Sequence, residues 1–374
     1  MTLAPLAILG IQSWSTFLSG LLAFFALYLI ISISLNVEMG YAGIPNFGKV
    51  LYFMGGAAFS GSVAIRAAAW IMHVSGNVVG FDNFLLADKL TSMLASDVPA
   101  SLALVAITMA VGGLVGGILG YVSIFPAIRL REDYLAMLLL GSAAFFQIFL
   151  GNYTPIINGT LGIGIPNFFA WAGSYSTVGA TLLIAAFAVI VYIYSERMVR
   201  SPLGRTLRAL RDNEAAAEAL GKDTVEIRRN VLIIASIITG VAGALYTIYT
   251  GDTNPAIYDR VTWTFWPWFI VILGGVASNS GVAVGTFVFV FLLQYIDATK
   301  FYLQDVLPFD VTWLEYLLFG SLLIVVLLLR PQGLLPEKPS HTLPKPEISR
   351  IVEGVDAGKD EERRDGARED GREG

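Results

Sequence analysis

The sequence predicts an all-α polytopic membrane protein with about eight to ten transmembrane helices and several glycine-broken or re-entrant segments. Hydrophobic residues make up 55% of the 374 residues and charged residues only 14%, whereas soluble domains carry about 25% charged residues. The mean hydropathy of +0.68 points the same way. Backbone in lipid must satisfy its own hydrogen bonds, and the apolar runs do not alternate as barrel strands do, so helices are expected.

Nine apolar stretches approach or exceed the length that a spanning helix needs. The first eleven residues form a further short apolar piece, and Met1–Gly10 has no basic region, so a cleaved signal peptide is not expected. The predicted spans are Trp14–Val37, Val50–Met72, Val98–Ile124, Tyr134–Leu150, Thr177–Tyr194, Val231–Tyr249, Thr262–Leu273, Gly281–Tyr295 and Thr312–Leu329.

The chain divides into a membrane domain, residues 1–335, and a charged tail, residues 336–374. From Pro346 onward the tail holds ten acidic and six basic residues and lacks aromatic residues. A segment of this composition buries too little apolar surface to fold, so disorder is expected.

Basic residues predict the orientation of the spans. Eight Lys and Arg residues lie between Glu196 and Asn230, whereas the loops around His73–Asp97, Gly151–Ser176 and Ile296–Asp310 carry few or none. Basic loops stay on the cytoplasmic side of a membrane. Residues 196–230 and the tail are therefore expected in the cytosol.

The composition argues against catalysis by this chain alone. It has no cysteine, and its two histidines, His73 and His341, are far apart, so no metal site is expected. We find no G-x-x-x-x-G-K-[ST] phosphate loop, no catalytic Ser/His/Asp cluster and no carboxylate pair within a span. Membrane lipid is an expected partner, and nucleic acid is not.

One cytosolic stretch, SPLGRTLRALRDNEAAAEALGKDT from Ser201 to Thr224, has a specific pattern. Ser201 and Pro202 suit the start of a helix, Asn213 suits the cap of a second helix with Glu214 at its positive end, and Thr224 suits the cap of a third. Gly221 suits a helix stop. The first helix would carry leucines on one face and arginines on the other; one continuous helix is the competing picture. The candidate docking residues are Arg205, Arg208, Arg211, Asn213, Glu214, Ala215, Ala216, Ala217 and Gly221.

This stretch resembles the cytoplasmic loop of ABC-transporter permeases of the branched-chain amino acid class, especially the LivM-type subunit. In ABC importers that loop carries a coupling helix, which fits a groove on the ATPase subunit. The alanine-to-glycine spacing of the general importer motif is met by Ala216, Ala217 and Gly221, while Glu214 falls one residue earlier than the acid of the motif.

Further segments resemble the same family in the right order. LNVEMGYAGIPNFGK (35–49) is similar to its G-Y-A-G-Q-L-S-L-G-H stretch, with Ile44, Asn46 and Lys49 as departures. RLREDYLAMLLLGSAAFFQI (129–148), NGTLGIGIP (158–166), LGGVASNSGVAVG (273–285) and RPQGLL (330–335) resemble other family segments. The resemblance implies an ABC importer permease fold.

Two glycine-broken patches, residues 40–48 and 274–285, could either line a substrate path or pack helices closely. Arg66, within a predicted span, could be functional or could reach the interface. The candidates for the translocation path are Gly40, Tyr41, Gly43, Asn46, Gln147, Gly274, Gly275, Ser278 and Asn279.

The resemblance implies a permease subunit of an ATP-driven importer of branched-chain amino acids in the plasma membrane. Its implied partners are a second related permease, two cytosolic ATPases that bind ATP and Mg²⁺, and an external solute-binding protein. The same fold could instead import urea, amides or sugars. An ion-coupled secondary transporter would need acidic residues at mid-span; the predicted spans contain almost none. A third alternative is a purely structural membrane subunit, but that role does not explain the glycine-broken segments.

Overall fold

The computed structural model describes residues 14–80, 82–130, 132–304 and 311–337. The first eleven residues and the tail beyond residue 337, to which the sequence assigns a short apolar piece and disorder, lie outside these ranges. The main helices are α1 (Trp14–Leu35), α2 (Lys49–Ile71), α3 (Asn83–Leu94), α4 (Val98–Arg129), α5 (Glu132–Asn152), α7 (Ser176–Arg200), α8 (Pro202–Asp212), α9 (Glu214–Ala219), α10 (Thr224–Thr250), α11 (Trp266–Gly274), α12 (Asn279–Gln304) and α13 (Val311–Leu329).

Short elements join these helices. Two π-helical segments, η2 (Asn36–Tyr41) and η6 (Val261–Phe265), continue α1 and precede α11. Strands β1 (Ile163–Gly164) and β2 (Asp252–Thr253) pair antiparallel, with Ile163 opposite Thr253. The remaining short helices are α6 (Thr154–Ile157), η3 (Gly159–Leu161), η4 (Ala170–Tyr175) and η5 (Pro255–Ile257).

The expected helices are present. Within the described ranges seven helices are long and apolar enough to cross a membrane, and two shorter apolar helices, Val261–Gly274 and Trp313–Leu329, complete the nine predicted stretches. The chain is therefore a multi-pass, all-α membrane protein. Helix α3 was not predicted; it lies in the loop between two spans and buries Leu86, Leu90 and Leu94.

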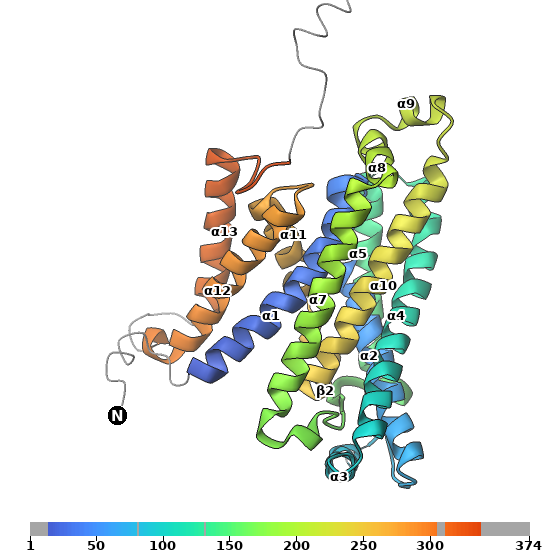
Figure 1. Cartoon of the computed structure of the whole chain (residues 1–374), viewed down its shortest axis with the longest axis vertical. Coiled ribbons are helices and arrows are strands. Elements are labelled where there is room, and N and C mark those ends of the chain that lie inside the picture. The colour runs from blue at the N-terminus through green and yellow to red at the C-terminus, as the bar shows by residue number, and fades with distance from the viewer. Residues whose placement is uncertain (1–13, 81, 131, 305–310, 338–374) are drawn as a thin grey trace, which may run out of the picture. The chain divides into compact units, whose positions relative to one another are not determined.

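Helices α2, α4 and α10 pack together through glycines (Figure 1). A Cβ added at Gly240 of α10 would meet the carbonyl oxygen of Gly112 of α4, and one added at Gly56 of α2 would meet the carbonyl oxygen of Gly240. Small residues allow helix backbones to approach this closely in lipid, where dispersion contacts replace the hydrophobic effect as the force of association.

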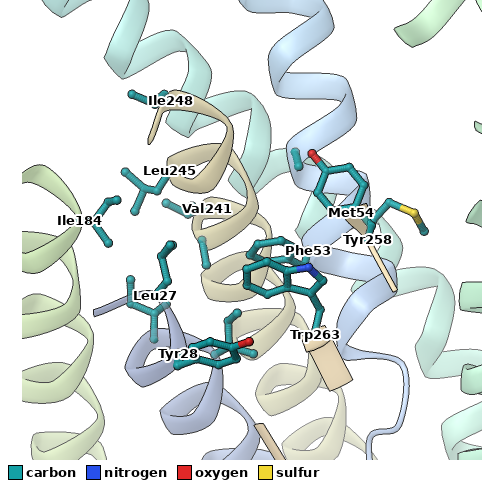
Figure 2. Close-up of a cluster of buried hydrophobic side chains, with 14 of the residues drawn as sticks. Leu27, Tyr28, Phe53, Met54, Ile184, Val241, Leu245, Ile248, Tyr258 and Trp263 are labelled. Carbon is teal, nitrogen blue, oxygen red and sulfur yellow. The ribbon is translucent and has the colours of Figure 1, made fainter. Parts of the chain in front are cut away.

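Aromatic side chains anchor η6 to the helix core. The indole of Trp263 stacks on Phe53 of α2 with ring centroids 3.9 Å apart, and Tyr28 of α1 stacks on the same indole at 5.7 Å. Figure 2 shows these rings beside Leu27 and Val241. The π-helical segment is thus held between α1 and α2, and it sets where the short helix α11 begins.

Candidate functional site

The stretch from Ser201 to Thr224 forms separate helices, as expected. Helix α8 ends at Asp212, α9 begins at Glu214, and Asn213 Oδ1 accepts a hydrogen bond from the amide of Ala216 at 3.0 Å. The competing picture of one continuous helix is wrong. The cap satisfies an amide that would otherwise lack a partner at the start of α9.

The stop at Gly221 is also present. Gly221 has φ +75°, its amide donates to Glu218 O at 2.8 Å, and the amide of Lys222 donates to Ala217 O. Glycine adopts this left-handed conformation without the penalty that a Cβ brings.

Ser201 and Thr224, which the sequence predicts as helix caps, do not cap helices through their side chains. Ser201 occupies the cap position of α8, but its hydroxyl donates backwards to Met198 O at 2.6 Å. Helix α10 is capped by Asp223, whose Oδ1 accepts from the amide of Glu226 at 2.9 Å. Thr224 instead lies inside the helix and donates to Glu218 Oε1 at 2.7 Å. A carboxylate one residue earlier is the stronger acceptor for the free amides.

The three arginines of α8 do not share one environment. Arg205 is exposed, whereas Arg208 and Arg211 are half-buried. Arg211 Nη1 donates to Gly40 O at 2.8 Å, and the Arg208 guanidinium lies 5.5 Å from the centre of the Tyr41 ring. The structure therefore brings two predicted docking residues together with two predicted path residues, at the end of η2.

Gly43 belongs to the same contact. It has φ +70°, and a Cβ added there would lie 3.2 Å from Cγ of Arg211. The backbone conformation favours glycine at this position, and a side chain there would also press on Arg211. The glycine stretch that follows α1 is thus shaped to receive helix α8.

Helix α9 presents a narrow outer surface. Ala215, Ala216 and Leu220 are exposed, with Leu220 at 79%, while Ala217 is buried against the body. Glu214 Oε2 lies 2.9 Å from Nη2 of Arg228 on α10, so this acid holds α9 in place. Small exposed side chains allow another protein surface to approach closely.

A fully buried ion pair, which the sequence analysis missed, lies behind this contact. Lys49 Nζ is 2.6 Å from Glu38 Oε2, and both side chains are 0% exposed. Lys49 also donates to the hydroxyl of Ser34 at 2.7 Å, and Asn46 Nδ2 donates to the Glu38 carboxylate at 3.1 Å. The helical run that includes α1 continues through η2 to Tyr41, so Glu38 lies within this run, near its end. The sequence does carry a signal for this pair, because Glu38 and Lys49 stand on either side of the glycine stretch 40–48.

The two glycine-broken patches meet at Asn36. Its Nδ2 donates to Asn279 Oδ1 at 3.0 Å, and its Oδ1 accepts from the amide of Ala277 at 2.9 Å. Asn279 in turn donates to Glu196 Oε2 near the end of α7, at 3.1 Å. The paired interruptions are therefore in direct contact. Gly40 packs here, because a Cβ on it would lie 2.7 Å from the amide nitrogen of Ala277.

The second patch mainly packs backbone against backbone. The amide of Leu335 donates to Gly274 O at 2.9 Å, and an added Cβ at Gly275 would lie 2.5 Å from Leu335 O. Ser278 Oγ accepts from the amide of Gly281 at 3.2 Å and so supports the start of α12. Of the two alternatives, lining a substrate path or packing closely, the contacts of Gly274 and Gly275 fit close packing.

Gln147, one of the predicted path residues, lines a cavity. The cavity, about 270 Å³, lies between α5 and the start of η6, and Gln147 Nε2 donates to Pro255 O at 2.9 Å. Its other lining residues are Leu140, Asp259, Arg260, Val261 and Phe265. A second cavity of about 620 Å³ shares Leu140 and Phe265 and extends to Phe47 and Asp133.

Arg66 lies near the end of α2. Its guanidinium donates to the carbonyl oxygens of Ser62 and Pro155, each at 2.8 Å. Bonding to backbone at one end of α2 explains how a charge is held there.

Comparisons with known proteins give one consistent family. The family described as "Branched-chain amino acid transport system / permease component" matches residues 17–327. A probable branched-chain amino acid transport permease protein LivM of Methanocaldococcus jannaschii is 34% identical over 87% of this chain and 95% of its own length. A high-affinity LivM permease protein of Salmonella typhimurium is 30% identical over 60% of this chain and 56% of its own. A LivH permease protein of the same organism is 28% identical over 53% and 64%. No solved structure matches.

Proposed function

Because this chain belongs to the family of branched-chain amino acid transport permeases, we propose that it is the transmembrane subunit of an ATP-driven importer of branched-chain amino acids. ATP hydrolysis would take place on separate subunits, which would bind the nucleotide and Mg²⁺. Helices α8 and α9 and the tail would face the cytosol, because the basic residues between Glu196 and Asn230 favour that side of the plasma membrane.

The observation that carries the proposal is the bond from Arg211 to Gly40. It joins the helix that would receive movement from an ATPase to the π-helical end of α1. A displacement of α9 would act on α8 through the short link at Asn213, and α8 would act on η2 through Arg211. Rigid helices with a few defined contacts are the usual means of carrying such movements.

The buried pair would pass the movement onward. Glu38 lies on η2 and Lys49 opens α2, so a shift of η2 must move α2 or separate the two charges. Separation is costly in a low-dielectric interior, so coupled movement of both elements is favoured. Alternating access would follow from the changed positions of α1 and α2 within the bundle.

The partners would be a second related permease, two ATPases and an external solute-binding protein. The exposed alanines of α9 suit a close protein contact, and exposed Arg205 suits pairing with a carboxylate on that partner. Substrate selection could rest on the binding protein, with weak recognition in the membrane.

Reconstituted vesicles that contain the complete complex test this function. Uptake of labelled leucine should require ATP and the binding protein and should persist when ionophores remove ion gradients. Uptake of labelled urea and of a labelled sugar is measured in parallel, because a permease of the same fold could import either solute instead. ATP-dependent urea uptake without leucine uptake would assign another substrate, and gradient-driven uptake without ATP would favour the secondary transporter.

A further inference from the structure

The cavity between α5 and η6 combines charge with apolar walls. Asp259 and Arg260 supply adjacent opposite charges, Gln147 supplies an amide, and Leu140, Val261 and Phe265 supply apolar surface. Its volume, about 270 Å³, is slightly below the roughly 300–1,000 Å³ typical of small-ligand sites. The space therefore suits a small amphiphilic solute.

The lengths of η6 and α11 bear on how deep these charges would lie in a membrane. Segment η6 has five residues and α11 nine, so at about 1.5 Å per residue they rise roughly 21 Å, less than the ~30 Å of hydrocarbon. Helix α11 ends at Gly274, close to the turn where Asn279 bonds Glu196 at the end of α7. With the end of α11 taken as one membrane surface, Arg260, just before η6, lies within the thickness of the hydrocarbon.

Arg260 is exposed at this depth and has no hydrogen bond or ion pair with any residue that the structure describes. A charged side chain at that depth is costly, and such residues usually face a polar path. Asp259 is fixed beside it, because Oδ1 accepts the amides of Val261 at 2.7 Å and Thr262 at 3.0 Å. Neither bond uses Oδ2.

We propose that this cavity is a substrate subsite for a zwitterionic amino acid with a branched apolar side chain. The Arg260 guanidinium pairs with the α-carboxylate, the Asp259 carboxylate accepts from the α-ammonium, and Leu140, Val261 and Phe265 surround the alkyl group. The subsite rests on the proposed function, since it names where that substrate is held. The neighbouring 620 Å³ cavity, past Phe265 toward Phe47 and Asp133, continues the path along α5.

The absence of cysteine from the chain makes a direct test possible. A single thiol is introduced by Leu140→Cys inside the cavity, and a control thiol by Phe145→Cys, a residue of the same helix that lines a different hollow. The complete complex of permease and ATPase subunits is placed in lipid nanodiscs, so that both faces are accessible. The rate of thiol modification on this chain is measured with and without leucine.

Leucine should slow modification of the Leu140→Cys thiol about fivefold at the ~80% occupancy reachable with excess ligand, and leave the Phe145→Cys thiol unchanged. Isoamylamine, which lacks the carboxylate, and 4-methylpentanoate, which lacks the ammonium, should protect much less. Adding Arg260→Ala should remove the protection by leucine, and Arg260→Lys should keep part of it.

Equal protection of both thiols, or equal protection by leucine and isoamylamine, would overturn the subsite. The analogue comparison needs no change at Arg260, so it remains decisive if Arg260→Ala does not fold. Vesicles with ATP-driven leucine uptake but no protection of Leu140→Cys would refute the subsite alone. Vesicles that take up another solute and not leucine would refute the proposed function as well.

Discussion

Lys49 Nζ lies 2.6 Å from Glu38 Oε2, and neither side chain reaches the surface. The pair connects the π-helical end of α1 to the first residue of α2, and Ser34 links it to Thr239 of α10 through a 2.9 Å hydroxyl contact. Charges this deep are tolerated only when both are present, because each compensates the other and hydrogen bonds satisfy the remaining atoms.

Removing one charge of the pair should therefore lower the stability of the protein more than removing both charges. We expect Glu38→Gln or Lys49→Met alone to lower the free energy of unfolding by about 3–5 kcal/mol, because an uncompensated charge stays buried. The double variant Glu38→Leu/Lys49→Met should lose less than either single variant. Chemical unfolding of the purified protein in nanodiscs measures all three. A double variant that loses the sum of the single losses would argue against a compensated pair.

The sequence predicted the spans and the separate helices α8 and α9, because both depend on local signals, but it missed the loop helix α3. Apolar length marks each span, and the cap at Asn213 and the stop at Gly221 mark α9. The Glu38–Lys49 pair depends on η2 continuing past the expected end at Val37 and then turning back. Arg260 precedes an irregular π-helical start, so its depth follows only from the shortness of α11. Contacts made by turns and half-helices leave little periodic signal.

Variants of two arginines of α8, Arg205 and Arg211, should distinguish binding of the ATPase from transfer of its movement to the membrane helices. Arg205 is exposed, so Arg205→Glu should weaken binding of the ATPase in a way that depends on salt, since screening acts on exposed pairs. Pull-down of the ATPase over a range of ionic strengths measures this. Unchanged recovery at every ionic strength would exclude a charged contact at Arg205.

Arg211→Ala is the matched variant on the same helix. It removes the bond to Gly40 inside the protein, so it should leave ATPase binding nearly intact and reduce leucine uptake per ATP hydrolysed. Parallel measurement of uptake and phosphate release gives this ratio. A normal ratio in Arg211→Ala would show that movement passes by another route.

Gly240 should be among the least replaceable glycines. A Cβ there would meet the carbonyl oxygen of Gly112 and lie 2.8 Å from Cα of Gly116, whereas a Cβ at Gly141 would meet nothing within 4 Å. Gly240→Ala should destabilise the protein by about 1–3 kcal/mol, the usual cost of overpacking, and Gly141→Ala should not. Thermal unfolding of both variants in the same lipid decides this. Equal midpoints would contradict close packing of α4 and α10.

Gly221 ends α9 with φ +75° and has open space where a Cβ would stand. A side chain at this position would strain the backbone but would not contact a neighbouring atom of this chain, so the effect of strain can be measured without a steric clash inside the protein. Gly221→Val should cost about 1–2 kcal/mol locally, since a β-branched residue is poorly accommodated in the left-handed region, and should lower recovery of the ATPase while the protein still inserts. Gly221→Asn is the control, because asparagine enters this region more readily, and it should retain most of the recovery. If both variants bind the ATPase as the parent does, the end of α9 is not part of the docking surface; if both fail equally, the side chain itself blocks the contact and the backbone conformation does not decide it.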